Sequence, residues 1–441
     1  MDPGTNHVTT EMEQDVSPER AMQHVRAYCR QVFQQRDEAY RKRLSGPRKT
    51  AFDLLRLMRP VWHPLKRLYK AYTLTAELGD KVAADSGVSK GRQFVQQAVL
   101  YLQHGVRPDD YYQYMLYRGD MRRHADTFIY HHQMDALMNT LAENISAEDA
   151  KILQDKVRFW RHCKEHDLAT IPVYATIDGE NIEWLETNAE WQLPPHDLFS
   201  KPADWGQGFG IKSWRHVEGS TYRDEDGIIL DGNALLERLR DQSLEIRRRV
   251  ILQPLVENAV ELSVLVGSNA LCSGRIVTIR EPGKEAEFLT AMLGLPAGNI
   301  GGSNFSDGAL GAPINEETGR LGRARFKRLS KVMESYEKHP NSGERIEGFT
   351  LPRWKEAVNL AIAAHESFPR IAFVGWDVAF AKNGPVLIEG NSGFGSNSIQ
   401  VTQGVPLGKS RLPTYHLWHT QATPGSRDSQ LAIPSFDGRV I

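Results

Sequence analysis

Two carboxylates and an amide interrupt a segment that otherwise has the composition of buried β-strand, WDVAFAKNGPVLIEGN (residues 376–391). The KNG triplet at 382–384 separates two apolar runs, which predicts a β-hairpin. A three-residue loop would place Asp377 directly opposite Glu389, whereas a two-residue Asn-Gly turn would place Val378 there. The register of the hairpin therefore decides whether the two carboxylates face each other.

In the first of these registers, Asp377, Glu389 and Asn391 present three oxygen donors on one face. Opposed side chains of an antiparallel pair have Cβ atoms roughly 4.5–5.5 Å apart, and residues two apart emerge on the same face. Two ionised carboxylates at that distance repel each other unless a cation lies between them, and Mg²⁺ prefers such ligands. The alternative is that the three residues form the solvent-facing side of an edge hairpin.

A second candidate site for phosphate lies in FSKPADWGQGFGIKSW (199–214). Lys201 ends a strand-like run, and Gly206, Gly208 and Gly210 follow it. A flexible glycine loop lets backbone N–H groups approach phosphate oxygens, and a nearby ammonium adds a positive charge. The alternative interpretation is an ordinary hairpin turn.

Other nucleotide and metal motifs are excluded. No G-x-G-x-x-G lies between a strand and a helix, so no dinucleotide fingerprint is present. GVPLGKS (404–410) has three residues between its glycines where a P-loop requires four. His162 and His166 lie four residues apart on a predicted helix, but no third ligand is evident. We interpret them as surface or helix-cap histidines.

The overall charge of −1 gives no general attraction to nucleic acid or to an acidic membrane. The basic run RKRLSGPRK (41–49) is interpreted as a solvated loop, with contact to phosphate or an anionic lipid carrier as the alternative. Cys29, Cys163 and Cys272 are too few and too far apart for a disulfide framework. The sequence has no signal-like apolar region and no membrane-length apolar run, so we expect a cytoplasmic protein.

Helical patterns dominate the first part of the chain, and short strands follow Pro172. A helix is predicted at 92–105 with Gly105 as its C-cap, and a single long helix at 147–168. The segment 352–369 predicts an amphipathic helix with one apolar stripe. Beyond about residue 410 the chain has no clear periodicity, which predicts a surface tail.

Several stretches, in their order and spacing, resemble the ATP-grasp superfamily, and most closely its sugar-transfer-associated branch. The resemblance extends from about Asp155 to about Gly408. Its matching stretches are DKVRFWRHC (155–163), KPADWGQGFG (201–210), ILQPLVEN (251–258), GRIVTI (274–279), SNFSDGALGAPINEETG (303–319), HPNSGERIEGFTLPRW (339–354) and FVGWDVAFAKNGPVLIEGN (373–391).

The resemblance implies an α+β fold in which two α+β subdomains clamp ATP, preceded by a helical region. The expected organisation is a disordered segment at 1–18, a helical region at 19–145, a first ATP-grasp part with its central lid at 146–260, a C-terminal part carrying the metal-binding hairpin at 261–410, and a tail at 411–441.

The same resemblance implies roles for the phosphate-binding residues. Asp377, Glu389 and Asn391 would hold two Mg²⁺ ions that bridge the phosphates of ATP. Lys156 and Lys201 would contact the phosphates, and the glycine loop with Gly206 and Gly208 would close over them.

The resemblance also assigns the base and substrate sides. The hinge begins at Gln253; the backbone of Leu255 and Val256 would contact adenine, and Glu257 the ribose. Arg275 would stabilise charge on the transferred phosphoryl group, and Asn304 would lie on the substrate side.

Three departures from the family pattern accompany these matches. Ser303 stands before Asn304 where the family has Asp, SGFGSN follows Asn391 without the usual Pro-Gly, and the hinge begins with Gln253 rather than Glu. These departures concern the substrate pocket more than the nucleotide site, and they leave a reduced or altered activity as an alternative.

The expected activity is that of an ATP-dependent carboxylate–amine ligase that works through an acyl phosphate. The name of the branch connects it with polysaccharide or glycoconjugate biosynthesis, and a uronic acid or an amino acid is the expected type of substrate. The alternatives are a small-molecule kinase, such as a sugar kinase, and a non-catalytic binding or scaffold protein. The helical region is a possible docking module for a biosynthetic partner, and no nucleic-acid partner is expected.

Overall fold

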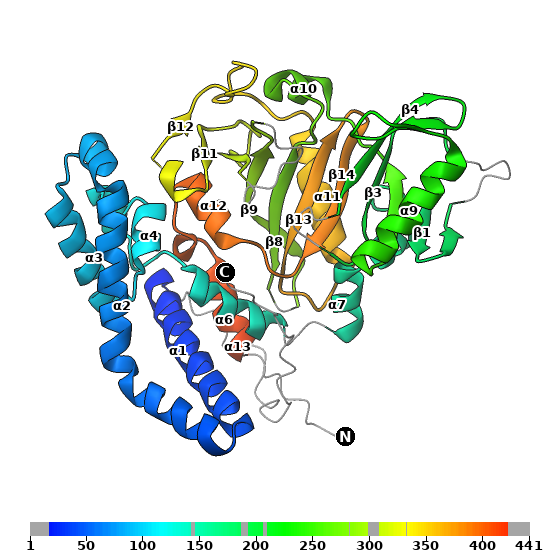
Figure 1. Ribbon diagram of the computed structural model, residues 1–441. Helices are drawn as coiled ribbons and strands as arrows, with labels where there is room; N and C mark the ends of the chain where they lie inside the picture. The colour runs from blue at the N-terminus through cyan, green and yellow to red at the C-terminus, as the bar shows by residue number, and fades with distance from the viewer. Residues whose placement is uncertain are drawn as a thin grey trace, which may run out of the picture.

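The computed structural model describes residues 17–142, 146–186, 193–205, 210–281, 283–298, 308–331 and 333–421. These residues form a helical region beside two antiparallel sheets of seven strands each (Figure 1). This α+β architecture agrees with the predicted fold class. Within the described part of the chain, no helix combines the length and the apolar character needed to cross a membrane.

The helical region begins at Pro18, directly after the N-cap Ser17. Its predicted helix at 92–105 is confirmed, and Gly105 ends it with a left-handed φ of 69°. Disorder was expected for residues 1–18. Residues 1–16 lie outside the described residues, whereas Ser17 and Pro18 already form the start of α1. The helices are α1 (Pro18–Arg43), α2 (Gly46–Ser86), α3 (Lys90–His104), α4 (Pro108–Gln113), α5 (Gly119–Arg122) and α6 (His131–Ala142).

The first sheet has the strand order β2-β1-β7-β3-β4-β5-β6. Helix α9 (Gly232–Ile246) covers one of its faces, where Leu235 and Leu239 pack against Trp214 and Tyr222. The strands are β1 (Ala175–Asp178), β2 (Asn181–Trp184), β3 (Leu198–Pro202), β4 (Lys212–Glu218), β5 (Thr221–Arg223), β6 (Ile229–Leu230) and β7 (Val250–Pro254).

The second sheet has the order β12-β11-β10-β9-β8-β13-β14. Helix α11 (Trp354–Glu366) lies behind it, with Trp354, Ala357 and Ala361 buried, which confirms the helix predicted at 352–369. Helix α10 (Val260–Val266) comes directly before the first strand of this sheet in the chain. The strands are β8 (Ser273–Arg280), β9 (Ala286–Leu295), β10 (Leu310–Pro313), β11 (Ala324–Phe326), β12 (Ser335–Tyr336), β13 (Phe373–Ala381) and β14 (Gly384–Asn391).

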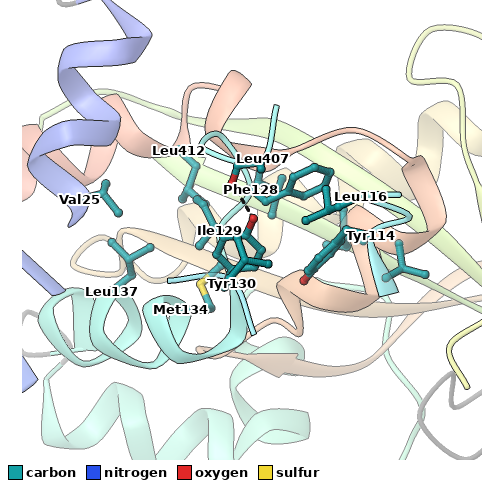
Figure 2. Packing of buried hydrophobic residues seen from close by; sticks show 14 of the residues in the cluster. Val25, Tyr114, Leu116, Phe128, Ile129, Tyr130, Met134, Leu137, Leu407 and Leu412 are labelled. Carbon is teal, nitrogen blue, oxygen red and sulfur yellow. Dashed lines mark hydrogen bonds between the residues drawn. The ribbon is translucent and has the colours of Figure 1, made fainter. Parts of the chain in front are cut away.

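A separate apolar core joins the helical region to the second sheet and to the C-terminal helices (Figure 2). It includes α12 (Ser396–Gln403), α13 (Leu412–Gln421) and the 3₁₀ turn Leu407–Lys409. The surface tail predicted beyond residue 410 is therefore wrong for residues 412–421, because Leu412 and Tyr415 are buried in this core. Residues 422–441 lie outside the described residues.

The long helix predicted at 147–168 is divided in two at Asp155. Helix α7 (Ala147–Gln154) ends there, and α8 (Lys156–Glu165) begins one residue later. Asp155 has extended backbone angles, and its carboxylate accepts hydrogen bonds from the N–H groups of Val157 and Arg158. The N-cap bond compensates for the interrupted helix, and it places Lys156 at the first position of a new helix.

The hairpin of β13 and β14 has a register that neither expected loop describes completely. Lys382 and Asn383 alone form the loop, so Ala381 pairs with Gly384. A β-bulge then leaves Ile388 without an opposing residue, and the register shifts by one. Beyond the bulge Asp377 lies directly opposite Glu389, the arrangement that the three-residue loop predicted.

Candidate active site

The polar end of the hairpin brings together the three oxygen-bearing side chains singled out in the sequence. Asp377 on β13 pairs in register with Glu389 on β14, and Asn391 follows two residues later on the same face. The amide nitrogen of Asn391 lies 3.3 Å from Oε1 of Glu389 and 3.5 Å from Oδ2 of Asp377. The three side chains therefore converge on one point rather than facing solvent separately.

Arg275 joins this group from the neighbouring strand β8. Its Cα is opposite Asp377 in the sheet, and its Nε and Nη2 donate to the two carboxylate oxygens at 2.5 and 3.0 Å. Such a two-point bond fixes the plane of the carboxylate as well as its position. The structure thus places Arg275 directly beside the predicted metal ligands.

The two carboxylates have opposite electrostatic surroundings. Burial raises the pKa of Asp377 to about 6, and Glu389 adds to that rise although Arg275 acts against it. Burial also acts to raise the pKa of Glu389, but Lys156 and Lys201 outweigh it, so this pKa lies below its usual value. A cation between the two carboxylates would offset the effects of burial and of Glu389, so it would favour the ionised form of Asp377.

Lys156 reaches this site from the helix break at Asp155. Its backbone N–H donates to the carbonyl of Ala203 at 3.0 Å, which attaches the start of α8 to the end of β3. Its Nζ lies 3.9 Å from Oε2 of Glu389 and donates to the carbonyl of Trp205 at 2.8 Å. The ammonium is therefore held between the hairpin and the segment that follows β3.

Lys201 approaches from the first sheet. It lies on β3 with only 8% of its surface exposed. Burial lowers the pKa of this lysine to about 8, and the positive charge of Lys156 lowers it further, whereas Glu389 and Asp377 raise it. Two lysines and two carboxylates thus interact across the space between the sheets.

The predicted hinge connects the two sheets. The backbone N–H of Leu255 donates to the carbonyl of Asp197 at 2.9 Å, and Glu257 lies exposed, 3.5 Å from Nζ of Lys382. The side chain of Gln253 is buried, and its Nε2 donates to the carbonyl of Ile171. Its Oε1 is buried without a hydrogen-bond partner among the described residues. Val256, between Leu255 and Glu257 in the sequence, is half-buried.

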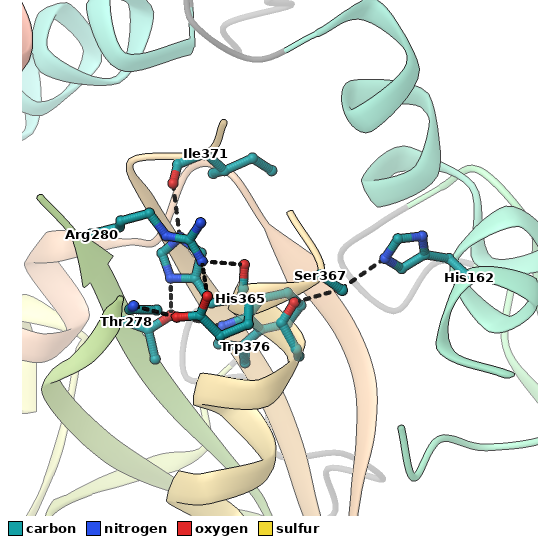
Figure 3. A network of polar contacts seen from close by, with 10 residues as sticks. His162, Thr278, Arg280, His365, Ser367, Ile371 and Trp376 are labelled. Atoms are coloured by element: carbon teal, nitrogen blue, oxygen red, sulfur yellow. Dashed lines mark hydrogen bonds and ion pairs between the residues drawn. The ribbon is translucent and has the colours of Figure 1, made fainter. Parts of the chain in front are cut away.

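A buried polar network holds β13 immediately before Asp377 (Figure 3). The indole N–H of Trp376 donates to Oγ1 of Thr278 at 2.9 Å. Nδ1 of His365 lies 2.8 Å from the same hydroxyl, and its Nε2 lies 2.8 Å from the carbonyl of Ile371. The neighbouring Arg280 bonds to Glu366 and to the carbonyl of His365. Helix α11 and two strands are thereby fixed to one another behind the site.

A cavity of about 180 Å³ opens at the ends of Lys156, Glu389 and Asn391. Trp205 and Asp204 line its other side, and neither was singled out from the sequence. Trp205 is placed by the cation–π contact of Arg248, 5.4 Å from its ring, and Asp204 by an ion pair with the same arginine. The only sequence signal for either was their position just before the glycine loop.

Three predicted site residues cannot be placed. Gly206, Gly208 and Asn304 lie outside the described residues, so their roles stay predictions. Among the residues that the structure describes, no group of three or more His, Cys, Asp and Glu side chains could hold a metal. The hairpin donor set differs from such a group because its third member is an amide.

The donor set fits Mg²⁺. Asp377, Glu389 and Asn391 supply hard oxygen ligands, and sites with one or two carboxylates usually leave other positions for water and phosphate oxygens. Burial and the neighbouring Glu389 raise the pKa of Asp377, and a cation bound beside it would favour its ionised form. With Lys156, Lys201 and Arg275 around it, this arrangement can bind a polyphosphate and stabilise charge during phosphoryl transfer.

Comparison with protein families gives one match. A family model described as sugar-transfer associated ATP-grasp matches residues 140–412, which is more than half of the chain. A search of curated proteins gave no match.

Among solved structures, the chain is similar to D-alanine-D-alanine ligase from Helicobacter pylori, with 12% identity and a TM-score of 0.35 over 63% of this chain and 60% of that one. The D-alanine-D-alanine ligase from Bacillus anthracis complexed with ATP has 14% identity and a TM-score of 0.33, over 62% and 67% of the two chains. The ADP complex of purK, N5-carboxyaminoimidazole ribonucleotide synthetase, has 12% identity and a TM-score of 0.34, over 60% and 52%. The chain thus spans less than two thirds of the Helicobacter pylori ligase.

Proposed function

The chain belongs to the sugar-transfer-associated ATP-grasp family, and from this premise we propose that it is an ATP-dependent ligase joining a carboxylate to an amine. The observation that carries the proposal is the convergence of Asp377, Glu389 and Asn391 opposite Lys156 and Lys201. This set of charges is suited to a triphosphate and its metal ions. It lies between the two sheets, where a nucleotide has contacts available from both.

The proposed reaction has two steps. A carboxylate oxygen of the substrate attacks the γ-phosphorus of ATP, the bond from that phosphorus to the bridging oxygen breaks, and ADP leaves. The amine nitrogen then attacks the acyl carbon, the carbon–oxygen bond breaks, and inorganic phosphate leaves with one oxygen of the original carboxylate. The ammonium form of the amine loses its protons to solvent or to a base of the site.

Each charged residue has a part in the first step. Lys201 and Lys156 orient the phosphates by charge-assisted hydrogen bonds. Arg275 holds Asp377 in one orientation, and its charge lies beside the place where negative charge gathers. Asp377, Glu389 and Asn391 would hold Mg²⁺. When bound, Mg²⁺ neutralises phosphate charge that would otherwise repel the incoming carboxylate.

The family description supports a narrower proposal about the substrate. A protein associated with sugar transfer would act on a carboxylate or amine that belongs to a polysaccharide or glycoconjugate, such as a uronic acid or an amino acid. The helical region would then be available to a biosynthetic partner. The statement about the substrate depends on the ligase activity proposed above, whereas a docking role of the helical region does not.

An oxygen-18 experiment tests the reaction. The protein is incubated with ATP, amines and pooled uronic acids and amino acids labelled in the carboxylate, and the released phosphate is analysed by mass spectrometry. A ligase transfers the label to inorganic phosphate, and the Glu389→Gln variant gives the background. A stable phosphorylated product without released phosphate would mean a kinase, and absence of ADP with every pool would mean a non-catalytic protein.

A further inference from the structure

The half of α2 nearest its bend with α1 has no buried side chain. The buried residues of this helix begin at Ala71, although the helix begins at Gly46. The bend at residues 44–45 lies at the end of the helical region far from both sheets (Figure 1). Residues 46–70 therefore extend beyond the part of the helix that is packed against the rest of the protein.

This segment nevertheless carries a continuous apolar surface. Leu54, Met58, Val61, Leu65 and Tyr69 recur at intervals of three or four residues, so they share one face of the helix. Each of them is at least 50% exposed. Exposed apolar surfaces of this kind mark interaction sites more often than isolated exposed residues do. We define the α2 stripe as these residues together with the flanking, equally exposed Leu55 and Trp62.

The end of α1 and the first half of α2 are strongly basic. Residues 36–70 contain eleven Lys and Arg against three Asp and Glu, although the whole chain carries a net charge of −1. Two of the three acids are already paired between α1 and α2. Arg41 bonds to Asp53 at 2.5 Å, and Arg59 bonds to Asp37. Lys70 pairs with Asp109, but six other basic residues of the segment are exposed: Lys42, Arg43, Arg48, Lys49, Arg56 and Lys66.

The exposed apolar side chains and the positive charge of this segment together favour one kind of binding partner. A second copy of the chain at this face would bring two surfaces of the same charge together, which opposes association. A helix with Leu, Trp and Tyr on one side and Lys and Arg on the other has the composition of helices that lie in a bilayer interface. Anionic lipids supply the opposite charge, and their acyl boundary accepts the apolar side chains.

We propose that residues 36–70 bind the surface of an anionic lipid bilayer, with the α2 stripe among the headgroups and the basic residues on lipid phosphates. This inference does not rest on the proposed ligase activity. The bend between α1 and α2 is remote from strands β13 and β14, so attachment through it leaves the space between the two sheets open (Figure 1).

Vesicle flotation of the full chain tests the proposal. The protein should float with vesicles of phosphatidylcholine mixed with phosphatidylglycerol. It should not float with vesicles of phosphatidylcholine alone, and it should dissociate from the anionic vesicles as the salt concentration is raised. Replacing Arg48 and Lys49 by Gln should reduce affinity by about fivefold per charge. The double variant Trp62→Ser, Leu65→Ser should lose binding, because it removes two apolar side chains of the stripe.

Leu102→Ser is the matched control, since Leu102 is 78% exposed on α3 and lies outside the α2 stripe. It should bind vesicles as the unchanged protein does, and circular dichroism should be the same for all variants. Trp62→Phe should keep binding but reduce the blue shift of tryptophan emission that vesicles cause.

Four results would overturn the proposal. The first three are no flotation with anionic vesicles, equal flotation with neutral vesicles, and an equal loss of vesicle binding in the Leu102→Ser control. The fourth is a protein that does not bind vesicles but forms a concentration-dependent dimer, which the Trp62→Ser, Leu65→Ser variant abolishes. The last would assign the stripe to a second copy of the chain. ATP turnover without vesicles should be the same in all these variants, so failure here is separate from failure of the proposed reaction.

Discussion

Arg275 and Asp377 lie opposite each other on neighbouring strands and are joined by two hydrogen bonds of 2.5 and 3.0 Å. The guanidinium thus orients a carboxylate that is expected to bind metal, and in the proposed reaction its charge would lie beside the transferred phosphoryl group. Because the pair lies on adjacent strands, its geometry depends on the sheet rather than on a loop. If the proposed roles hold, Arg275 both aligns a metal ligand and stabilises transferred charge, and the next prediction tests this.

Removing Arg275 should reduce turnover more than ATP affinity. In the Arg275→Ala variant Asp377 loses its orienting partner, and charge in the transition state loses a nearby cation; we expect a fall in kcat of about 10²- to 10³-fold. Arg275→Lys keeps the charge without the planar fork, so it should recover only part of the rate. Steady-state kinetics and an ATP titration separate the two effects. Equal losses of affinity and of kcat would contradict this role.

Glu389→Gln should abolish Mg²⁺-dependent ATP turnover, and Mg²⁺ should no longer increase the affinity of the variant for ATP. The side chain keeps its shape but loses the charge that would hold the cation. Without Mg²⁺, ATP should bind this variant at least as well as the unchanged protein, because a negative charge near the phosphates is gone. Calorimetry with and without Mg²⁺ measures this, and thermal unfolding checks the fold. The exposed Glu317→Gln is the control; normal turnover of Glu389→Gln would show that the metal assignment is wrong.

The hairpin illustrates how far the sequence alone leads. Its strands and the facing of Asp377 and Glu389 follow from residue types and a loop count, since side chains alternate along a strand. The bulge at Ile388 does not follow, because an extra residue in one strand depends on how the sheet packs. The correct facing was predicted through a three-residue loop that the protein does not have.

Other misses have a similar origin. The N-cap at Asp155 had a local signal, since Asp is favoured at that position, but the helical pattern on both sides obscured it. Helix α13 had no such signal. Its burial depends on α1 and α6, which lie far away in the sequence, and a local pattern contains no information on such contacts. The carbonyl of Trp205 beside Lys156 is likewise a consequence of tertiary structure.

ATP affinity should decrease as the pH rises through about 8. Phosphate binds the protonated form of Lys201, and the pKa of this lysine in the free protein is lowered to about 8 by burial and by Lys156. Below that pH the ammonium is already present; above it, binding must take up a proton, so the dissociation constant should rise by up to about tenfold per pH unit. Calorimetric titrations from about pH 7 to about pH 9 test this. Lys201→Arg keeps its charge throughout and should remove the dependence; a constant affinity in the unchanged protein would contradict the assignment.

Acid should destabilise the protein partly through His365. This side chain is fully buried, and burial lowers its pKa to about 4, with Arg280 acting in the same direction. The carbonyl of Ile371 can only accept a hydrogen bond, so Nε2 carries the proton of the neutral ring and Nδ1 accepts from Thr278. Protonation would put an N–H on Nδ1, which then could no longer accept from the Thr278 hydroxyl. It would thereby disturb the same hydroxyl that accepts a hydrogen bond from the Trp376 indole.

The sign of this effect follows from the two pKa values. An unfolded histidine has a pKa of about 6.5, so between about pH 6.5 and pH 4 the unfolded state binds more protons than the folded state. The contribution of neutral His365 to stability is therefore complete above about pH 6.5 and is lost as the pH falls towards 4, by roughly 3 kcal/mol in total. Urea unfolding over this range should give a shallower pH dependence for His365→Gln than for the unchanged protein. His63→Gln, at an exposed position on α2, should leave the slope unchanged, and equal slopes for His365→Gln and the unchanged protein would show that this histidine is not the group that titrates.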